Sequence, residues 1–303
     1  MNSPPISSPL LALAAELAPR PGYNATPLPN IRILRSETVL EDVPVLYRPG
    51  AVFVLQGSKQ GFLDGEIYRY DADHYLAVSV PVPFRMASQA SPGQPLLAIY
   101  FDFDLHLAAE IAATLEEQVD HAERVRARSL VSSRMVPTIV DVLQRLLHAL
   151  HHPQELAILG PGLLRELHYR VLAGPQGGAL MAALRRNETT GRIVQSLSLI
   201  RERYNEGLSV PELAAAAGMS VPSYHAGFKL LTGNTPIQYI KALRLHEARL
   251  MIARRQGSLA VIAAEVGYAS PAQFSRDFKR HFRRSPIEEA KWTREHLGET
   301  AQA

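Results

Sequence analysis

The chain has 303 residues, of which 47% are hydrophobic and 20% are charged. At about 150 residues per domain this length predicts two domains, and the hydrophobic content is ample for two cores. The absence of cysteine excludes disulfides, thiolate nucleophiles, iron–sulfur clusters and cysteine-ligated zinc. The net charge of +3 is too small to indicate a nucleic-acid partner by itself.

The basic charge is concentrated toward the C-terminal end. Residues 1–189 carry 16 basic and 19 acidic side chains, whereas residues 190–303 carry 16 basic and 10 acidic ones. The first nine residues lack a positive region and contain three prolines, so they do not resemble a secretory signal. No stretch reaches the ~18 uninterrupted apolar residues that would span a bilayer. We therefore expect a cytoplasmic protein with no membrane partner.

Short runs of alternating apolar residues fill the region from about residue 28 to residue 103. Turn formers such as Pro49-Gly50 and Asp64-Gly65 separate them, and Ser58 and Lys59 are also expected to lie in a turn. This spacing predicts a small antiparallel barrel or sandwich. The predicted strands are Ile31–Leu34, Val43–Tyr47, Val52–Leu55, Glu66–Tyr70, Tyr75–Val80 and Leu96–Phe101.

Beyond Asp104, which is suited to cap a helix, the pattern changes to long apolar stripes. A hinge is expected at Gly174–Gly178, and from Glu188 onward the pattern is entirely helical. We therefore predict an α+β protein with an N-terminal domain over residues 1–173, a linker over 174–189 and an all-α domain over 190–303. The predicted helices before residue 188 are Leu105–Gln118, Val136–His151, Leu163–Leu172 and Ala179–Arg186.

The region 208–290 nearly repeats itself once, at an offset of 49 that becomes 50 through one inserted residue. In the first copy, Ser209 and Glu212 form a capping box, Gly218 suits a turn of positive φ, and Ser220 caps a second helix. Each copy is therefore predicted to be a helix-turn-helix. Between the copies, Thr235 and Pro236 begin a long helix, Ile237–Ala253, that holds the two units apart.

The exposed face of each second helix carries residue types that contact DNA. Gln and Arg pair with base edges, whereas Lys and Arg neutralise phosphates. One such pattern would equally fit a helical bundle with a solvated basic face, but two copies favour DNA binding. The predicted DNA-binding residues are Ser220, Pro222, His225, Ala226, Lys229, Ser270, Gln273, Arg276, Lys279 and Arg280.

This C-terminal third resembles the AraC/XylS family of bacterial transcription regulators. The family has one recognition helix in each helix-turn-helix, and the resemblance places Gln273 and Arg276 on the base-reading face of the second unit. In the first unit that face carries Ala226 and then Gly227, where the family often has a large polar residue. The motifs are Leu213-Ala214 to Gly218-Met219-Ser220, Phe228-Lys229 to Gly233, Thr235-Pro236 to Tyr239-Ile240, Leu243-Arg244-Leu245 to Ala248-Arg249, Ile262-Ala263 to Val266-Gly267-Tyr268, and Phe274-Ser275-Arg276 to Phe278-Lys279.

Upstream segments resemble the N-terminal domain of one AraC subfamily. Its fold is similar to a degenerate cupin-like barrel followed by helices. The resemblance implies an effector-sensing or dimerisation domain, and hence operator DNA, a small-molecule effector, a second copy of the chain and RNA polymerase as partners. The segments are Tyr47-Arg48-Pro49, Leu55-Gln56-Gly57-Ser58-Lys59, Tyr75-Leu76 with Ser79, and His168-Tyr169-Arg170 followed by Gly174.

Other constellations give no metal or catalytic site. Asp102, Asp104 and His106 would share a face on a strand, but Asp104 is better suited to cap the following helix. A metal-dependent cupin needs two histidines two residues apart, whereas His74 is the only histidine of the predicted barrel. His148, His151 and His152 lie at a helix end, where the negative dipole favours them over a metal.

The sequence therefore predicts a sequence-specific DNA-binding regulator with no cofactor, no enzymatic activity and an unknown effector site. Two alternatives stay open. One is a cupin-type enzyme with an appended DNA-binding domain, and the other is a ligand-free dimeric regulator. The apolar residues of the Val136–Leu172 helices, among them Leu143 and Leu167, predict self-association of the N-terminal domain.

Overall fold

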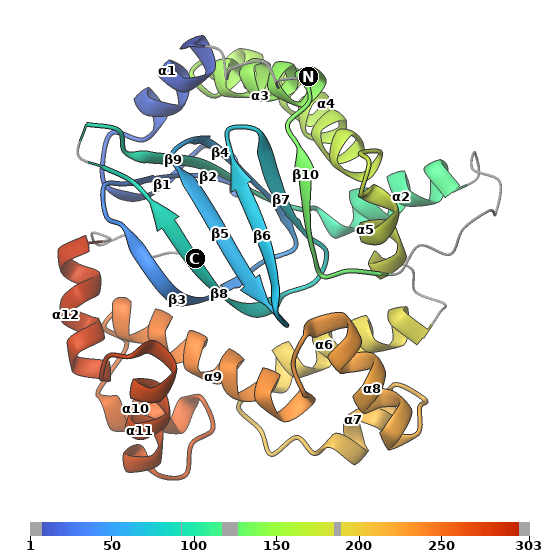
Figure 1. The fold of residues 1–303 in the computed structure, drawn as a ribbon, viewed down its shortest axis with the longest axis vertical. Helices are drawn as coiled ribbons and strands as arrows, with labels where there is room; N and C mark the ends of the chain where they lie inside the picture. Colours follow the sequence, from blue (N-terminus) through green and yellow to red (C-terminus); the bar gives the residue numbers. More distant parts are fainter. Residues whose placement is uncertain (1–7, 92, 117–126, 185–188, 297–303) are drawn as a thin grey trace.

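The computed structural model describes residues 8–91, 93–116, 127–184 and 189–296 (Figure 1). A curled antiparallel sheet forms the N-terminal part, and helices cover its outer side. A second group of helices, which contains the C-terminal third of the chain, lies against the opposite end of the sheet. The α+β architecture with a half-open barrel and an all-helical C-terminal region confirms the predicted fold class.

Ten antiparallel strands form one sheet. The order along it is β1-β2-β9-β4-β7-β6-β5-β8-β3, and β10 pairs with β7 beside this path. The six predicted strands are present, whereas β1, β5, β8 and β10 were not expected. The strands are β1 (Gly22–Ala25), β2 (Ile31–Ser36), β3 (Leu40–Tyr47), β4 (Gly50–Gln56), β5 (Ser58–Leu63), β6 (Glu66–Asp71), β7 (His74–Val78), β8 (Val82–Gln89), β9 (Leu96–Asp102) and β10 (Leu130–Arg134).

The two faces of the sheet carry separate cores because successive side chains on a strand point to opposite sides. On β4, Phe53 packs outward with the N-terminal helices, whereas Val52 and Val54 pack inside the curve. On β9, Ile99 faces the helices and Tyr100 faces the inside. The N-terminal helices do not cover the inner face, so this face is free to line a cavity.

The expectation that Ser58 and Lys59 lie in a turn is wrong. The turn is made at Gly57, whose φ of +80° suits glycine, and β5 begins at the next residue. Lys59 thereby lies inside the barrel, paired in register with Tyr70 of β6 and Ser88 of β8.

Five helices accompany the sheet. Asp104 caps α2, as predicted, because its Oδ1 accepts hydrogen bonds from the backbone N–H of His106 (2.9 Å) and of Leu107 (3.2 Å). The predicted helix ends at Gln118 and Arg186 lie outside the described residues. The helices are α1 (Ser8–Leu17), α2 (Leu105–Glu116), α3 (Pro137–Leu150), α4 (Pro153–Leu172) and α5 (Gly177–Leu184).

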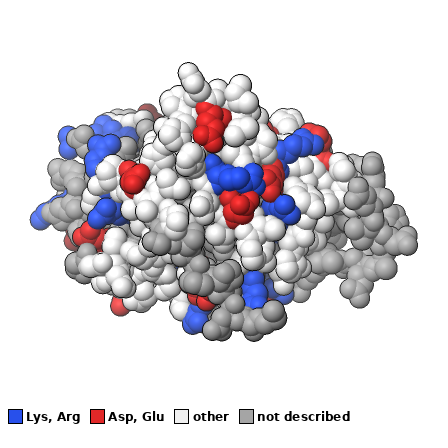
Figure 2. Space-filling view, turned by 90° about the horizontal axis from the view of Figure 1, so that it is seen from above, with Lys and Arg blue, Asp and Glu red and all other residues white. Residues whose placement is uncertain are grey.

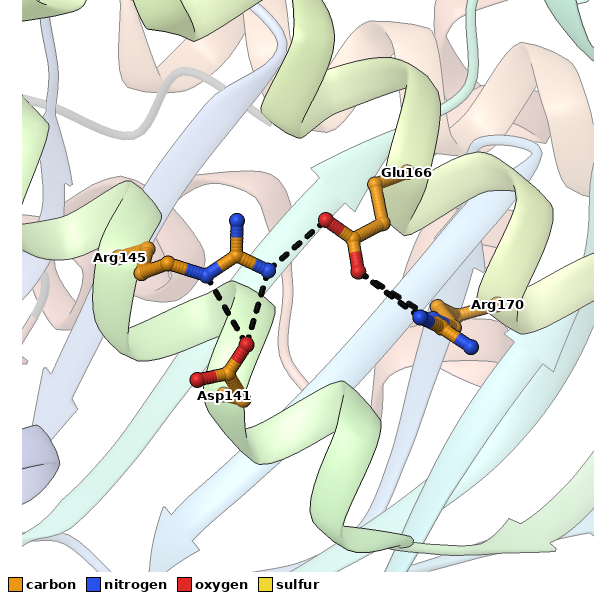
Figure 3. Close-up of polar contacts among 4 residues, drawn as sticks. All are labelled: Asp141, Arg145, Glu166 and Arg170. Atoms are coloured by element: carbon orange, nitrogen blue, oxygen red, sulfur yellow. Dashed lines mark hydrogen bonds and ion pairs between the residues drawn. The ribbon is translucent and has the colours of Figure 1, made fainter.

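Charged side chains connect α3 to α4 on their outer surface (Figure 3). The guanidinium of Arg145 donates to Asp141 one turn away on α3 (2.9 Å) and to Glu166 on α4 (2.8 Å). Arg170 donates to the other oxygen of Glu166 (3.1 Å). Of these pairs, Arg145–Glu166 joins the two helices, and half-exposed pairs of this kind contribute only ~0–1 kcal/mol each.

The C-terminal region consists of helices alone within its described residues. Two buried clusters hold it together, one around Tyr224, Phe228 and Tyr239 and the other around Phe274 and Phe278. The helices are α6 (Thr189–Arg203), α7 (Val210–Ala216), α8 (Val221–Thr232), α9 (Pro236–Ala253), α10 (Leu259–Glu265), α11 (Pro271–Phe282) and α12 (Pro286–His296).

Candidate DNA-reading helices and an interdomain cavity

The first helix-turn-helix comprises α7 and α8. Ser209 and Glu212 form the predicted capping box, and Gly218 makes the turn with a φ of +61°. The side chain of Ser220 accepts a hydrogen bond from the backbone N–H of Ser223 and so caps α8. These local features were predicted from the sequence and are confirmed.

The second helix-turn-helix comprises α10 and α11. Ser258 caps α10, Ser270 caps α11, and Gly267 makes the turn with a φ of +81°. Phe274 and Phe278 are fully buried, which leaves the opposite side of α11 to the solvent. Thr235 caps α9, and this helix connects the two units.

The ten predicted DNA-binding residues are on or next to α8 and α11, and their contact with DNA stays a prediction. Nine of them are exposed and Ser270 is half-buried. Arg280 differs from the others because it pairs with Asp277 and lines a cleft against Arg85 of the barrel. The exposed set is Ser220, Pro222, His225, Ala226, Lys229, Gln273, Arg276, Lys279 and Arg280.

Gly227 has a packing reason within α8. A Cβ at this position would lie 2.6 Å from Cδ1 of Ile193 on α6, which is closer than carbon atoms approach. A side chain at this position would therefore need the end of Ile193 to shift, so α6 and α8 pack closely beside Ala226 on the first recognition helix.

Helix α9 also contacts the barrel directly. The phenol of Tyr239 donates to the backbone carbonyl of Pro81 (2.8 Å), and the amide of Asn234 donates to that of Pro83 (3.3 Å). The guanidinium of Arg249 lies 3.4 Å from the carbonyl oxygen of Pro44. The helix that spaces the two DNA-reading units is thus bonded to the N-terminal domain through Tyr239 and Arg249, and the turn that precedes it is bonded through Asn234.

A cavity of about 280 Å³ lies between the inner face of the sheet and α9. Its lining includes six basic residues and only two acidic ones, Asp102 and Glu247. Aromatic and aliphatic side chains fill the rest of the wall, including Tyr23, Tyr47, Tyr100 and Trp292. The basic lining residues are Arg32, Arg48, Lys59, Arg201, Arg249 and Arg254.

Lys59 is the buried cation of this cavity, with only 2% of its surface exposed. Its Nζ donates to the phenol oxygens of Tyr100 (2.8 Å) and Tyr47 (3.4 Å). The phenol of Tyr47 also lies 3.3 Å from that of Tyr70. Burial lowers the pKa of Lys59 to about 7, and burial raises the pKa of each of these three tyrosines well above its ordinary range.

The cavity wall formed by α9 is also polar. His246 is buried, and its Nε2 has no hydrogen-bond partner among the described residues. Arg249 pairs with the fully buried carboxylate of Glu289 on α12 (2.6 Å), and Arg284 pairs with the same carboxylate (2.7 Å). A molecule in the cavity would therefore contact both the barrel and the helix that joins the DNA-reading units.

This cavity was not predicted from the sequence. Its lining comes from strands far apart in the chain, so no local pattern marks it. One feature of the sequence could have drawn attention to Lys59, which is the only lysine in residues 1–228.

Of the other constellations, Asp102 lies in the cavity wall, whereas Asp104, His148 and His152 do not. Asp102 pairs with Arg32 (3.1 Å), which together with the capping role of Asp104 explains both carboxylates without a metal. His148 and His152 approach Glu155, and one ligand atom from each lies within 4.8 Å of the others. These three side chains are exposed or half-exposed at the α3–α4 junction, and His148 pairs with Glu155 (3.5 Å).

Comparisons of sequence match both parts of the chain to known families. The family described as "AraC-type transcriptional regulator N-terminus" matches residues 27–179, and one described as "Helix-turn-helix domain" matches residues 213–291. The HTH-type transcriptional activator RhaS of Yersinia pestis (strain Pestoides F) is 34% identical over 100 residues, which are 33% of this chain and 37% of RhaS. The chain thus covers little more than a third of the length of the curated relatives it matches.

Solved structures share the fold. An apo variant of ToxT from Vibrio cholerae superposes with a TM-score of 0.56 at 12% identity, covering 90% of this chain and 99% of ToxT. Wild-type ToxT bound to an unsaturated fatty acid superposes with a TM-score of 0.58 at 12% identity, covering 86% and 93%. None of the described helices has the length and hydropathy that a bilayer crossing requires.

Proposed function

This chain belongs to the AraC family of transcription regulators, and from that membership we propose that it binds operator DNA under the control of a small-molecule effector. The observation that carries the proposal is the pair of capped helix-turn-helix units with exposed α8 and α11. We assign DNA binding to residues 190–303, effector sensing to residues 1–173, and the connection between them to residues 174–189. The proposal includes no enzymatic turnover.

In this proposal α8 and α11 enter successive major grooves about 34 Å apart along the DNA. Selection of random DNA fragments by the purified full-length protein should recover a site with two conserved segments spaced by about one helical turn. Affinity should fall steeply with salt, because Lys and Arg side chains displace counterions from phosphates. Arg276→Ala should weaken binding to the selected site, whereas Arg69→Ala, an exposed arginine on β6, should not. Binding without sequence preference, or equal effects of the two variants, would contradict the assignment.

We place the effector in the cavity between the sheet and α9. Its volume of about 280 Å³ suits a small organic molecule, and its surplus of basic residues favours an anionic group. ToxT, which shares the fold, has been solved with an unsaturated fatty acid, and this supports an organic effector here. Trp292 is the only tryptophan of the chain and lines the cavity, so its fluorescence should report binding of small carboxylates. A change of fluorescence without any change of operator affinity would contradict effector control.

We further propose that the regulator acts as a homodimer through the outer face of α4. The leucines on which the sequence-based argument rested, such as Leu143 and Leu167, are buried against the sheet and cannot form that surface. Ile158 and Leu159 on α4 are instead 79% and 48% exposed. Seen from above, the side of the molecule with α3 and α4 is mostly uncharged, with a small charged group near its middle (Figure 2).

Ultracentrifugation of the full-length protein should therefore show a dimer that Ile158→Glu dissociates. Ile67→Glu, at an isoleucine on β6 that is 65% exposed, is the matched control and should leave the dimer intact. A wild-type monomer at high micromolar concentration would exclude this interface. We also propose that this regulator contacts RNA polymerase. We propose that it acts in the cytoplasm.

A further inference from the structure

Lys59 is an unusual choice of residue for its position. It is the only lysine in residues 1–228, a region in which arginine is otherwise used instead of lysine. A buried arginine keeps its proton and its charge, whereas a buried lysine readily loses its proton and becomes a neutral amine. Among the described residues of the barrel's inner face, Lys59 is the buried cation, and it is therefore of the type that can act as a nucleophile.

The surroundings of Lys59 favour the neutral amine. No carboxylate among the described residues forms an ion pair with it, and the carboxylate of the barrel wall, Asp102, pairs with Arg32 and Arg48. Burial lowers the pKa of Lys59 to about 7, so the neutral amine is accessible near neutral pH. Because buried charges are ordinarily paired, the lack of an ion pair here favours the uncharged form of the amine.

The groups that face Lys59 are hydroxyls on the sheet and cations across the cavity. Tyr47 and Tyr100 contact its Nζ, and Tyr70 and Ser88 are its register partners on the neighbouring strands. The wall formed by α9 presents His246, Arg249 and, as its acidic member, Glu247. Burial raises the pKa of Tyr100 well above its ordinary range, so its hydroxyl is protonated and can donate a hydrogen bond.

We propose that Lys59 captures an aldehyde or ketone effector as an imine, which deepens the effector role proposed above for the cavity. The lone pair of Nζ attacks the carbonyl carbon, a C–N bond forms, and the carbonyl oxygen takes a proton from the hydroxyl of Tyr100. That hydroxyl recovers a proton from Nζ, which gives a neutral carbinolamine. The C–O bond then breaks, water leaves with the second amine proton, and a C=N bond remains. One water is released, and no oxidant or reductant is needed.

The cavity also restricts which carbonyl compound fits. A volume of about 280 Å³ admits a molecule of several carbons, and the basic lining favours one that carries a carboxylate. Arg32 and Lys59 lie on the same aromatic ring, at 5.9 Å and 5.4 Å from the centre of Tyr100. An oxo acid could thus place its carboxylate toward the arginine and its carbonyl toward the amine.

Glyoxylate is a suitable probe because it has both groups. The full-length protein would be treated with glyoxylate and sodium cyanoborohydride, which reduces an imine to a stable carboxymethyl amine, and modification would be quantified at each of the five lysines by mass spectrometry. We expect Lys59 to be modified at least tenfold faster than the exposed Lys229 and Lys279. The rate at Lys59 should rise between pH 6 and pH 8 and then level off. Modification of Lys59 no faster than that of the exposed lysines would overturn the proposal.

Two comparisons separate this proposal from the effector role itself. Glycolate has the carboxylate of glyoxylate but no carbonyl, so it should bind more weakly and modify no lysine. If both compounds raise Tm but Lys59 stays unmodified, covalent capture is wrong and the effector cavity stands. If Lys59 is modified rapidly but operator affinity is unchanged, capture is supported and effector control fails. Lys59→Arg should abolish modification at that site. If this variant does not fold, the rate of modification of Lys59 relative to Lys229 and Lys279 in the wild type tests the proposal instead.

Discussion

Tyr239 of α9, whose side chain is buried, donates its phenolic hydrogen to the backbone carbonyl of Pro81 over 2.8 Å, and this hydrogen bond joins the DNA-binding region to the barrel. Tyr239→Phe removes the donor and leaves that carbonyl without its partner. The expected loss is about 1–3 kcal/mol in the free energy of unfolding. Urea denaturation would measure it, with Tyr204→Phe, at a half-buried tyrosine, as the control. A cost of a few tenths of a kcal/mol would mean that water replaces the bond.

Local signals made the helix-turn-helix units predictable. Capping serines and turn glycines act within four residues of each other, so Ser209, Gly218 and Ser220 specify their structure regardless of the rest of the chain. Because the helix-turn-helix unit is duplicated, the same capping and turn residues occur twice and support the prediction twice. The α+β class was also predictable, because the hydrophobic period changes near Asp104 from that of strands to that of helices.

The cavity could not be predicted in this way. Strand β5 has the sequence SKQGFL, and two of its three inward positions are a lysine and a glycine rather than apolar residues, the third being Leu63. Gly61 is small because a Cβ there would lie 2.9 Å from the ring of Phe84 on β8. Both residues are explained only by the three-dimensional fold, in which β8 pairs with β5 and β9 brings Tyr100 to Lys59. Long-range strand pairing, which is absent from local patterns, therefore decides the site.

The carboxylate of Glu289 is fully buried between Arg249 and Arg284, and its removal should destabilise the C-terminal region strongly. Breaking a buried ion pair from one side leaves uncompensated charge and costs about 3–5 kcal/mol. Glu289→Ala should lower the urea midpoint accordingly. Glu265→Ala, at an exposed glutamate on α10, should change it by less than about 0.5 kcal/mol. Similar effects of the two variants would exclude a structural role for the triad.

Two histidines should make the second helix-turn-helix sensitive to acid. Burial lowers the pKa of His281 to about 4 and, with the charge of His281 beside it, lowers the pKa of His246 well below its ordinary value of 6.5. Between pH 6.5 and 4 the unfolded chain therefore binds more protons than the folded one, so stability is full above pH 6.5 and falls as the pH is lowered. His246→Leu should reduce this pH dependence.

Urea midpoints at pH 7.5, 6 and 5 would test this prediction. The exposed His225 provides the control, and His225→Gln should retain the pH dependence of the wild type. A wild-type protein whose stability is unchanged between pH 7.5 and 5 would show that neither buried ring is held neutral by the fold.

The two recognition helices should discriminate unequally between bases. On α11 the exposed face carries Gln273 and Arg276, whose side chains can each make two hydrogen bonds to a base edge, worth about 1–3 kcal/mol of discrimination for each pair. On α8 the matching face carries His225 beside Ala226, and Gly227 packs closely against Ile193 of α6. The first unit can therefore read thymine methyl groups by apolar contact but offers fewer hydrogen bonds to base edges.

A complete single-base scan of the selected operator would measure this difference. Arg276→Ala should relax the preference at one or two positions by about 5- to 150-fold in Kd, the range that corresponds to 1–3 kcal/mol. His225→Ala should relax it less, and Lys279→Ala should weaken binding to all sequences alike, because a phosphate contact positions the protein without reading bases. Equal penalties across both segments, or a larger loss from His225→Ala than from Arg276→Ala, would show instead that α8 carries the specificity.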